Sequence, residues 1–236
     1  MFSGLTVKNY REMLTKLAWF FFFVTAICIY LIRFNIPQVA NVFVELAGFL
    51  PKEVKLFGLS PVDGLPLVIA AFLAFLSHAI KLHDRLSDIL KIRERFDVSH
   101  ILIPTAYLAD VDARKVSVDV IKKSREELMR ATFYKYASSA EGDNSIVSKH
   151  TIEQSLTNWS WYWVLLEANF ALLITIIALW ILSSFPVSWL FFLFILSTGL
   201  MRYFKDEARS NALKQLADIT RTDDVRGDIK AEFEKL

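Results

Sequence analysis

Polar side chains that interrupt apolar runs are the first residues of this sequence that could do chemistry. Glu167 and Asn169 stand inside the run VLLEANFALL, and His78 and Lys81 lie at the end of another apolar run. A carboxylate at the centre of a bilayer costs about 3 kcal/mol, so it faces protein or water and takes a partner. At a rise of about 1.5 Å per residue, Glu167 and His78 lie at similar depths. We therefore expect His78 to be the partner of Glu167, with Lys81 as the next candidate.

Two interpretations of this intramembrane polar set, Glu167, His78, Asn169 and Lys81, differ in function. In the first, which the sequence favours, the pair is structural and fixes the packing of two helices. In the second it is a proton-sensitive, water-lined gate, because an imidazole changes charge near neutral pH. The residue types fit both interpretations.

The sequence contains no motif typical of an enzyme, a cofactor site or a metal site. It has neither GxxxxGK[ST] nor a GxGxxG after a strand, and it has no HExxH and no paired CxxC. His78 and His83 are five residues apart, which places them on different faces of a helix, and Cys28 is the one cysteine. We therefore predict that the protein is not an enzyme and that it uses no cofactor or metal ion.

A run of alternating charges, HDRLSDILKIRERFD over residues 83–97, is a candidate surface for a partner protein. Its candidate docking residues are Asp84, Arg85, Asp88, Lys91, Arg93 and Arg95. The other interpretation, which the sequence favours, is an ordinary solvated helix face. Residues 82–158 carry 12 Lys and Arg against 12 Asp and Glu, so this region is neutral. Nucleic-acid binding needs a clustered positive surface, and we predict no direct contact with nucleic acid.

Four apolar runs are long enough to cross a bilayer, which requires about 20 mostly apolar residues and at least about 17. With tolerant flanks they cover residues 17–32, 65–81, 159–183 and 187–204. Residues 184–186 between the last two runs form only a short turn that ends at Pro186. The last two spans are therefore expected to form an antiparallel hairpin. Of the 27 Lys and Arg residues, 24 lie on one side of these spans, while Arg33, Lys52 and Lys55 lie on the other.

Basic residues concentrate on the cytoplasmic side of membrane proteins, so this distribution places both termini in the cytoplasm, in a cell inner membrane. We predict an all-α fold: a polytopic four-helix transmembrane bundle with helical cytoplasmic extensions. Residues 1–16, the insert 82–158 and the tail 205–236 are the cytoplasmic parts, and residues 33–64 form a periplasmic loop.

Each segment outside the predicted spans has its own helical pattern. In the periplasmic loop, residues 37–50 form a helix too short to span. It is either an interfacial or re-entrant helix against the outer leaflet or a helix packed on the tops of the spans. In the insert, we expect one helix to continue from the second span, a second over residues 112–136, a turn at residues 138–145, and a third that leads into the third span. After Thr222, a short final helix places Val225, Ile229 and Phe233 on one face.

The span count, the placement of both ends, the insert 82–158 and the charged tail after Arg202 resemble the four-span membrane subunits of bacterial antiphage defence systems. The Kiwa membrane subunit, which works with a soluble DNA-binding partner, is the nearest in architecture. Membrane effectors of nucleotide-signalling defence systems are similar as well. The resemblance implies an inner-membrane sensor of phage attack that forms an oligomer and controls its partner, and it carries over no ligand-binding or catalytic residue.

Two functions remain open at this point. The first is a non-enzymatic scaffold or sensor that contacts membrane lipid, forms a homo-oligomer, and recruits or regulates a cytoplasmic partner protein. The second is a pore-forming effector or ion channel, in which Glu167 and Asn169 line the conduit. No span has a repeated polar face, which favours the first.

Overall fold

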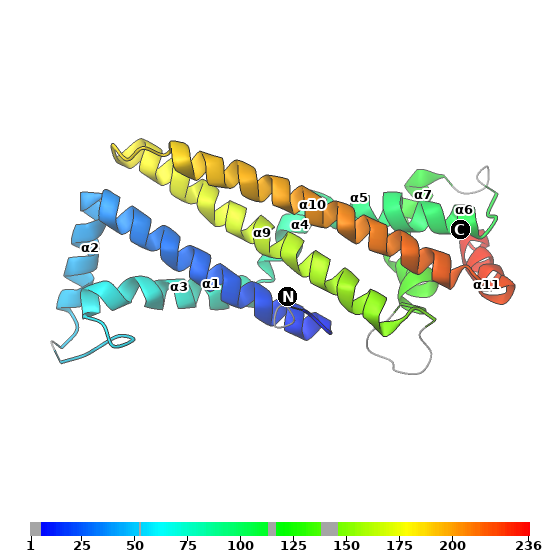
Figure 1. Ribbon diagram of the computed structural model, residues 1–236, viewed down its shortest axis with the longest axis horizontal. Coiled ribbons are helices and arrows are strands. Elements are labelled where there is room, and N and C mark those ends of the chain that lie inside the picture. Colours follow the sequence, from blue (N-terminus) through cyan, green and yellow to red (C-terminus); the bar gives the residue numbers. More distant parts are fainter. Residues whose placement is uncertain (1–5, 52, 113–116, 138–145) are drawn as a thin grey trace. The chain divides into compact units, whose positions relative to one another are not determined.

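The computed structural model describes residues 6–51, 53–112, 117–137 and 146–236, and in these ranges it contains helices and no strand (Figure 1). The predicted turn at residues 138–145 lies outside the described residues, as do residues 113–116 of the predicted helix 112–136. The all-α prediction is confirmed for the described part of the chain. The residues group into two compact units. The apolar unit comprises Leu14–His83 and Trp161–Arg202, and the polar unit comprises Met1–Met13, Asp84–Ser160 and Tyr203–Leu236.

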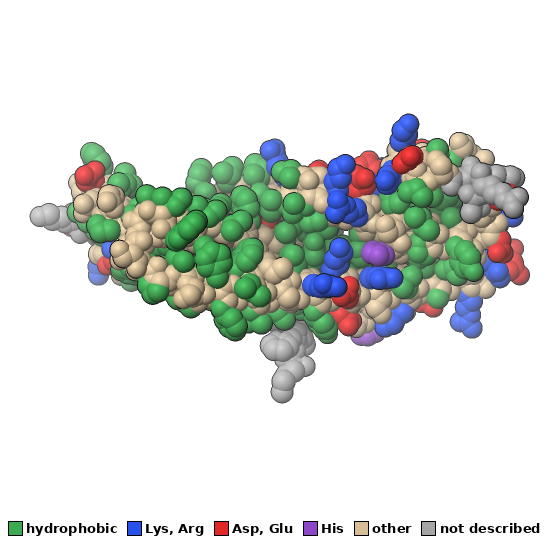
Figure 2. Space-filling model, turned by 90° about the horizontal axis from the view of Figure 1, so that it is seen from above, with side chains coloured by type: hydrophobic (Ala, Val, Ile, Leu, Met, Phe, Trp, Pro, Cys, Tyr) green, Lys and Arg blue, Asp and Glu red, His purple; other side chains and the backbone are tan. Residues whose placement is uncertain are grey.

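Four long helices contribute all or part of their residues to the apolar unit. They are α1 (Tyr10–Asn35), α3 (Pro61–Ala79), α9 (Lys149–Leu182) and α10 (Ser188–Ile219). Large apolar side chains such as Phe75, Trp180 and Ile195 are exposed on them, and Figure 2 shows hydrophobic side chains covering the left-hand part of the visible face. A soluble protein rarely exposes so continuous an apolar surface. The protein is therefore helical with a surface suited to lipid.

Three helices of the described residues, α1, α3 and α9, are long and apolar enough to cross a membrane. The predicted fourth span, residues 187–204, forms the first part of α10, which is not among these three helices. This helix begins with a run of Leu, Phe and Ile but runs on through Arg202, Lys205 and Asp206 without a break. Three candidate spans are thus established, and the fourth crossing stays a prediction.

The predicted loop helix is present as α2 (Pro37–Gly48), which begins with Pro37 in its first turn. Pro37 suits that place because the first amides of a helix have no intrahelical acceptor. Phe43 and Ala47 are buried, and α2 packs on α3. Val42, Val44 and Leu46 are exposed, and so is Phe49, the residue that follows the helix. One side of α2 therefore packs on protein, and its other side presents apolar groups.

An ion pair joins α1 to the start of α3. The guanidinium of Arg33 lies 2.9 Å from the carboxylate of Asp63, and the Tyr30 hydroxyl donates to the Asp63 carbonyl at 2.5 Å. The Ser60 hydroxyl accepts the Asp63 amide, which is the usual N-cap arrangement. These contacts set where α3 begins.

The predicted continuation of the second span as one helix is wrong. Instead α3 ends at Ala79, α4 covers Leu82–Ile89, and α5 covers Ile92–Phe96. Lys81 and Lys91 separate these helices and have left-handed φ angles of 51° and 52°. Such a conformation costs a non-glycine residue about 1 kcal/mol, so the surrounding contacts must hold it. The two lysines occupy the sixth place of similar ten-residue stretches, LSHAIKLHDR and LSDILKIRER, over residues 76–85 and 86–95.

The polar unit is built from short helices around its own apolar core. After α5 come the π-helix η2 (Asp97–Leu102), α6 (Ile103–Leu108), α7 (Val118–Lys123), α8 (Arg125–Leu128), the π-helix η3 (Met129–Tyr134) and finally α11 (Asp223–Glu234). The predicted final helix after Thr222 is confirmed as α11, and Ile229 and Phe233 are buried in the core with Phe96, Leu102 and Leu216.

Gly64 provides a test of the packing at the start of α3. A Cβ at this position would lie 2.7 Å from the carbonyl oxygen of Leu56, which is backbone and cannot move aside easily. We expect Gly64→Ala to lower the free energy of unfolding by about 2 kcal/mol in detergent. Gly199→Ala in α10, where a Cβ meets nothing within 4 Å, is the matched control and should be neutral or stabilising. Equal stability of the two variants would contradict the predicted clash.

Candidate functional site

Glu167 of α9 is buried, at 2% exposure, and it is held by residues on both sides of the break between α3 and α4. Its carboxylate accepts a hydrogen bond from the Ser77 hydroxyl and another from the backbone amide of His83. The Nδ1 atom of His83 lies 3.8 Å from Glu167 Oε1, and the imidazole is also buried. The ring of Trp163, on α9, lies 6.0 Å from the imidazole.

The predicted partners of Glu167, His78 and Lys81, do not contact it in this arrangement. Both side chains are exposed, and His83 takes the place expected for His78. The prediction counted depth along one continuous helix, whereas the left-handed turn at Lys81 starts a new helix. That turn places the first amides of α4 at the carboxylate.

The physical reason for this contact lies at the N-terminus of α4. The first amides of a helix have no intrahelical acceptor, and the helix dipole favours a negative group there. Because His83 is the second residue of α4, its amide is one of the donors without an acceptor inside the helix. Glu167 therefore accepts the amide of His83, a donor that the break between α3 and α4 would otherwise leave buried without an acceptor. The arrangement can hold two helix ends together; it contains no activated nucleophile.

Asn169, the remaining member of the predicted polar set, binds α10 instead. The Ser197 hydroxyl donates to its Oδ1 atom, and its Nδ2 atom donates to Thr198 Oγ1 at 3.4 Å. Residues two apart lie on nearly opposite faces of an α-helix, so Asn169 cannot share the environment of Glu167. It joins the two arms of the α9–α10 hairpin.

The predicted docking residues separate into two groups. Asp84 and Arg93 form an ion pair at 2.8 Å, and the Arg93 amide donates to the Ser87 hydroxyl at 3.2 Å. These contacts bridge the break at Lys91 and have a structural role. The side chains of the second group are exposed, and they are Arg85, Asp88, Lys91 and Arg95. Beside them, Ile89 is 76% exposed and Leu90 is also exposed.

A buried ion pair in the polar unit had no counterpart among the sequence predictions. Asp97, the first residue of η2, lies 2.8 Å from the guanidinium of Arg125 in α8. Burial raises the pKa of the Asp97 carboxyl to about 6, although the charges of Arg125 and Arg93 act in the opposite direction. The pair is 28 residues apart in the chain, and no periodicity connects residues at that distance. The only sequence signal was the position of Asp97 at the end of the charged run.

In the described part of the chain, no group of three or more His, Cys, Asp or Glu side chains could hold a metal ion. The family model of the YmfE protein family matches residues 9–235 of the chain. Comparisons with curated proteins and with solved structures gave no match.

Glu167→Leu tests the contact at the helix break. The substitution leaves the Ser77 hydroxyl and the His83 amide buried without their acceptor, and we expect it to cost about 3 kcal/mol of stability in detergent. Glu167→Gln keeps an acceptor oxygen and should cost clearly less. Hydrogen exchange of the His83 amide should become faster in the Leu variant. An unchanged exchange rate would show that this amide does not depend on Glu167.

Arg125→Gln tests the buried ion pair through its pH dependence. The folded state holds the Asp97 proton more tightly than the unfolded state, so this group stabilises the fold most fully at low pH and loses that contribution as the pH rises through about 6. Without Arg125, the charged carboxylate at pH 7.5 is buried without its ion-pair partner, and we expect a loss of about 3 kcal/mol. At about pH 5 the carboxyl is protonated and the loss should be smaller.

The measurement is hydrogen-exchange protection of residues 125–134, corrected for the intrinsic effect of pH. Arg130→Gln, which removes an exposed cation of the same segment, is the matched control and should change little at either pH. A loss of protection in Arg125→Gln that is equal at both pH values would contradict the role of Asp97.

Proposed function

The chain belongs to the YmfE protein family, a name that states no activity, and we propose that it is a non-enzymatic scaffold or sensor of the inner membrane. In this proposal it forms a homo-oligomer and recruits or regulates a cytoplasmic partner protein. The observation that carries the proposal is the short helix α4. Its first turn is held by Glu167 of a candidate span, and its later residues present exposed apolar and charged groups.

The membrane side of the proposal rests on α2 and α3. The exposed side chains of α2 include the apolar Val42, Val44 and Leu46 beside the polar Asn41 and Glu45, a mixture that fits the interfacial region of a bilayer. Because α2 packs on α3, a change in the membrane that displaces α2 would act on α3. Packed helices respond to such forces by shifting or rotating as units. The end of α3 carries Ser77, so a shift of α3 would act on the contact at Glu167.

The partner side rests on the exposed residues of α4 and the turn that follows. Ile89 and Leu90 are apolar, and Arg85 and Asp88 are charged neighbours. Protein interfaces commonly have an apolar centre with a polar rim, and a few central apolar residues supply most of the binding free energy. We assign the partner contact to these four residues. Asp84 and Arg93, which pair with each other, are assigned a structural role.

The setting of this function is also part of the proposal. The distribution of Lys and Arg supports four spans with both termini in the cytoplasm. The resemblance to membrane subunits of antiphage defence systems supports a role in detecting membrane perturbation during infection. The alternative, a pore, has less support because Glu167 and Asn169 are both buried and hydrogen-bonded within the chain.

The experiment is gentle extraction of the full chain, tagged at its C-terminus and expressed at native level, followed by native mass spectrometry. We expect an oligomer that carries a soluble protein in fixed stoichiometry. The double variant Ile89→Ser with Leu90→Ser should keep the oligomer and lose at least about 90% of that protein. Leu213→Ser, another exposed leucine of the polar unit, is the matched control and should retain it.

Either of two results would contradict the proposal. One is a monomer that shows neither a partner nor self-association after cross-linking in the membrane. The other is a bare oligomer that conducts ions in reconstituted bilayers, with a conductance that Glu167→Gln changes.

A further inference from the structure

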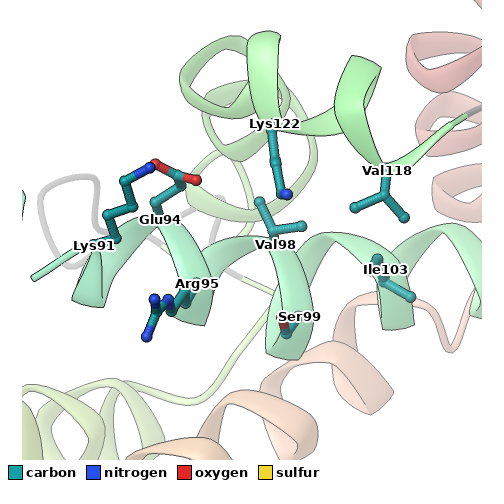
Figure 3. A pocket seen from close by; sticks show the side chains of 8 residues that line it. All are labelled: Lys91, Glu94, Arg95, Val98, Ser99, Ile103, Val118 and Lys122. Atoms are coloured by element: carbon teal, nitrogen blue, oxygen red, sulfur yellow. The ribbon is translucent and has the colours of Figure 1, made fainter.

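A pocket of about 360 Å³ lies in the polar unit, along α5 and η2 and beside α7 (Figure 3). Its apolar wall consists of Val98, Ile103 and Val118. Its cationic side chains are Lys91 and Arg95, at the start of α5 and within it, and Lys122 of α7. Its size is in the range of pockets that bind small molecules.

The charges of this pocket are unbalanced. Three cations line it, and Glu94 is the one carboxylate among its lining residues. Figure 3 shows the side chains of Lys91 and Glu94 reaching toward one another, while Lys122 extends from α7 toward Val98. The lining residues therefore carry three cations against one carboxylate, an excess of two positive charges beside an apolar wall. Cations that line one pocket raise the positive potential there, and a bound anion lowers their mutual repulsion.

The backbone conformation at Lys91 affects which cations line the pocket. Lys91 has the left-handed conformation that separates α4 from α5, a conformation that a lysine adopts only at a cost. The ion pair between Asp84 and Arg93 spans the same break. Arg93 therefore faces a carboxylate, while Lys91 and Arg95, two residues to either side, line the pocket. Arg93 is not one of its lining residues.

We propose that this pocket binds a phosphate-bearing ligand, with the cations contacting the phosphate and Val98, Ile103 and Val118 contacting its less polar portion. Arg and Lys are the usual partners of phosphate oxygens, and Ser99 in the lining adds a hydroxyl donor. A soluble phosphorylated metabolite and the headgroup of an anionic phospholipid share this chemistry. The site does not depend on the scaffold function, because its residues are separate from the exposed residues of α4.

The test uses the full chain in nanodiscs of phosphatidylcholine, titrated with inorganic pyrophosphate at low ionic strength by calorimetry. We expect saturable binding of one pyrophosphate per chain. The triple variant Lys91→Gln, Arg95→Gln and Lys122→Gln should weaken binding at least about tenfold, since phosphate affinity depends on each cation. Glu94→Gln should strengthen binding, because it removes the competing negative charge from the pocket.

The matched control is the triple variant Lys123→Gln, Arg130→Gln and Lys149→Gln, which removes three exposed cations that do not line the pocket. It should bind pyrophosphate as the wild type does. Absence of saturable binding, or equal weakening in both triple variants, would overturn the proposal.

A second arm distinguishes the two sources of phosphate. In nanodiscs containing phosphatidylglycerol, a pocket that takes lipid headgroups should bind pyrophosphate more weakly, and only in chains with the three pocket cations. Unchanged pyrophosphate binding in these nanodiscs would assign the pocket to a soluble ligand. Both results support the phosphate site and differ only in its natural occupant.

Discussion

A buried carboxylate at the end of a helix is the constraint on which the apolar unit depends. Glu167 would be costly in any environment that left it without donors, and the amide of His83 would be costly without an acceptor. Each satisfies the other, and Ser77 adds a second donor. The end of α3, the left-handed turn at Lys81 and the start of α4 all follow from bringing these groups together. A continuous helix through this region would have consumed the amide and left the carboxylate unsatisfied.

A second break between helices follows ten residues later, and different side chains stabilise it. Lys91 again takes the left-handed conformation, but here the amide of Arg93 is accepted by Ser87, and the charges are balanced by Asp84 and Arg93. The two serines hold equivalent places in similar sequence stretches. In the apolar unit the serine donates to a carboxylate, and in the polar unit the serine accepts an amide. Small hydroxyl side chains suit both roles because they can donate and accept.

The two units differ in where their apolar side chains lie. The apolar unit presents aromatic and aliphatic side chains that need lipid, while the polar unit buries its own apolar core of Phe96, Leu102, Leu216, Ile229 and Phe233. Two π-helices, η2 and η3, lie within that core, and such helices often mark functional sites. The buried Asp97 is at the start of η2, and the proposed phosphate pocket lies along it. In the polar unit, the buried carboxylate and the proposed phosphate pocket therefore both lie at η2.

Composition and periodicity alone determined the class of this protein. Runs of apolar residues predict membrane helices because the backbone must satisfy its hydrogen bonds within each span, and α1, α3 and α9 match three of the four predicted runs. The helix at residues 37–48 and the buried face of α11 also followed from local pattern, since proline placement and helical spacing are local signals. The sequence also predicted that Glu167 has a polar partner, because an ionisable group in a span needs one.

The tertiary structure decided which partner that was. His83 could not be preferred over His78 by counting, because one residue in the left-handed conformation changes every position that follows it. Nothing in the spacing linked Asp97 with Arg125, or Asn169 with Ser197 and Thr198, because these contacts depend on how separate helices pack. Packing also decided which residues of the charged run 83–97 form ion pairs, which are exposed and which line the pocket. Local patterns determine which segments are helical, and only packing determines which side chains meet.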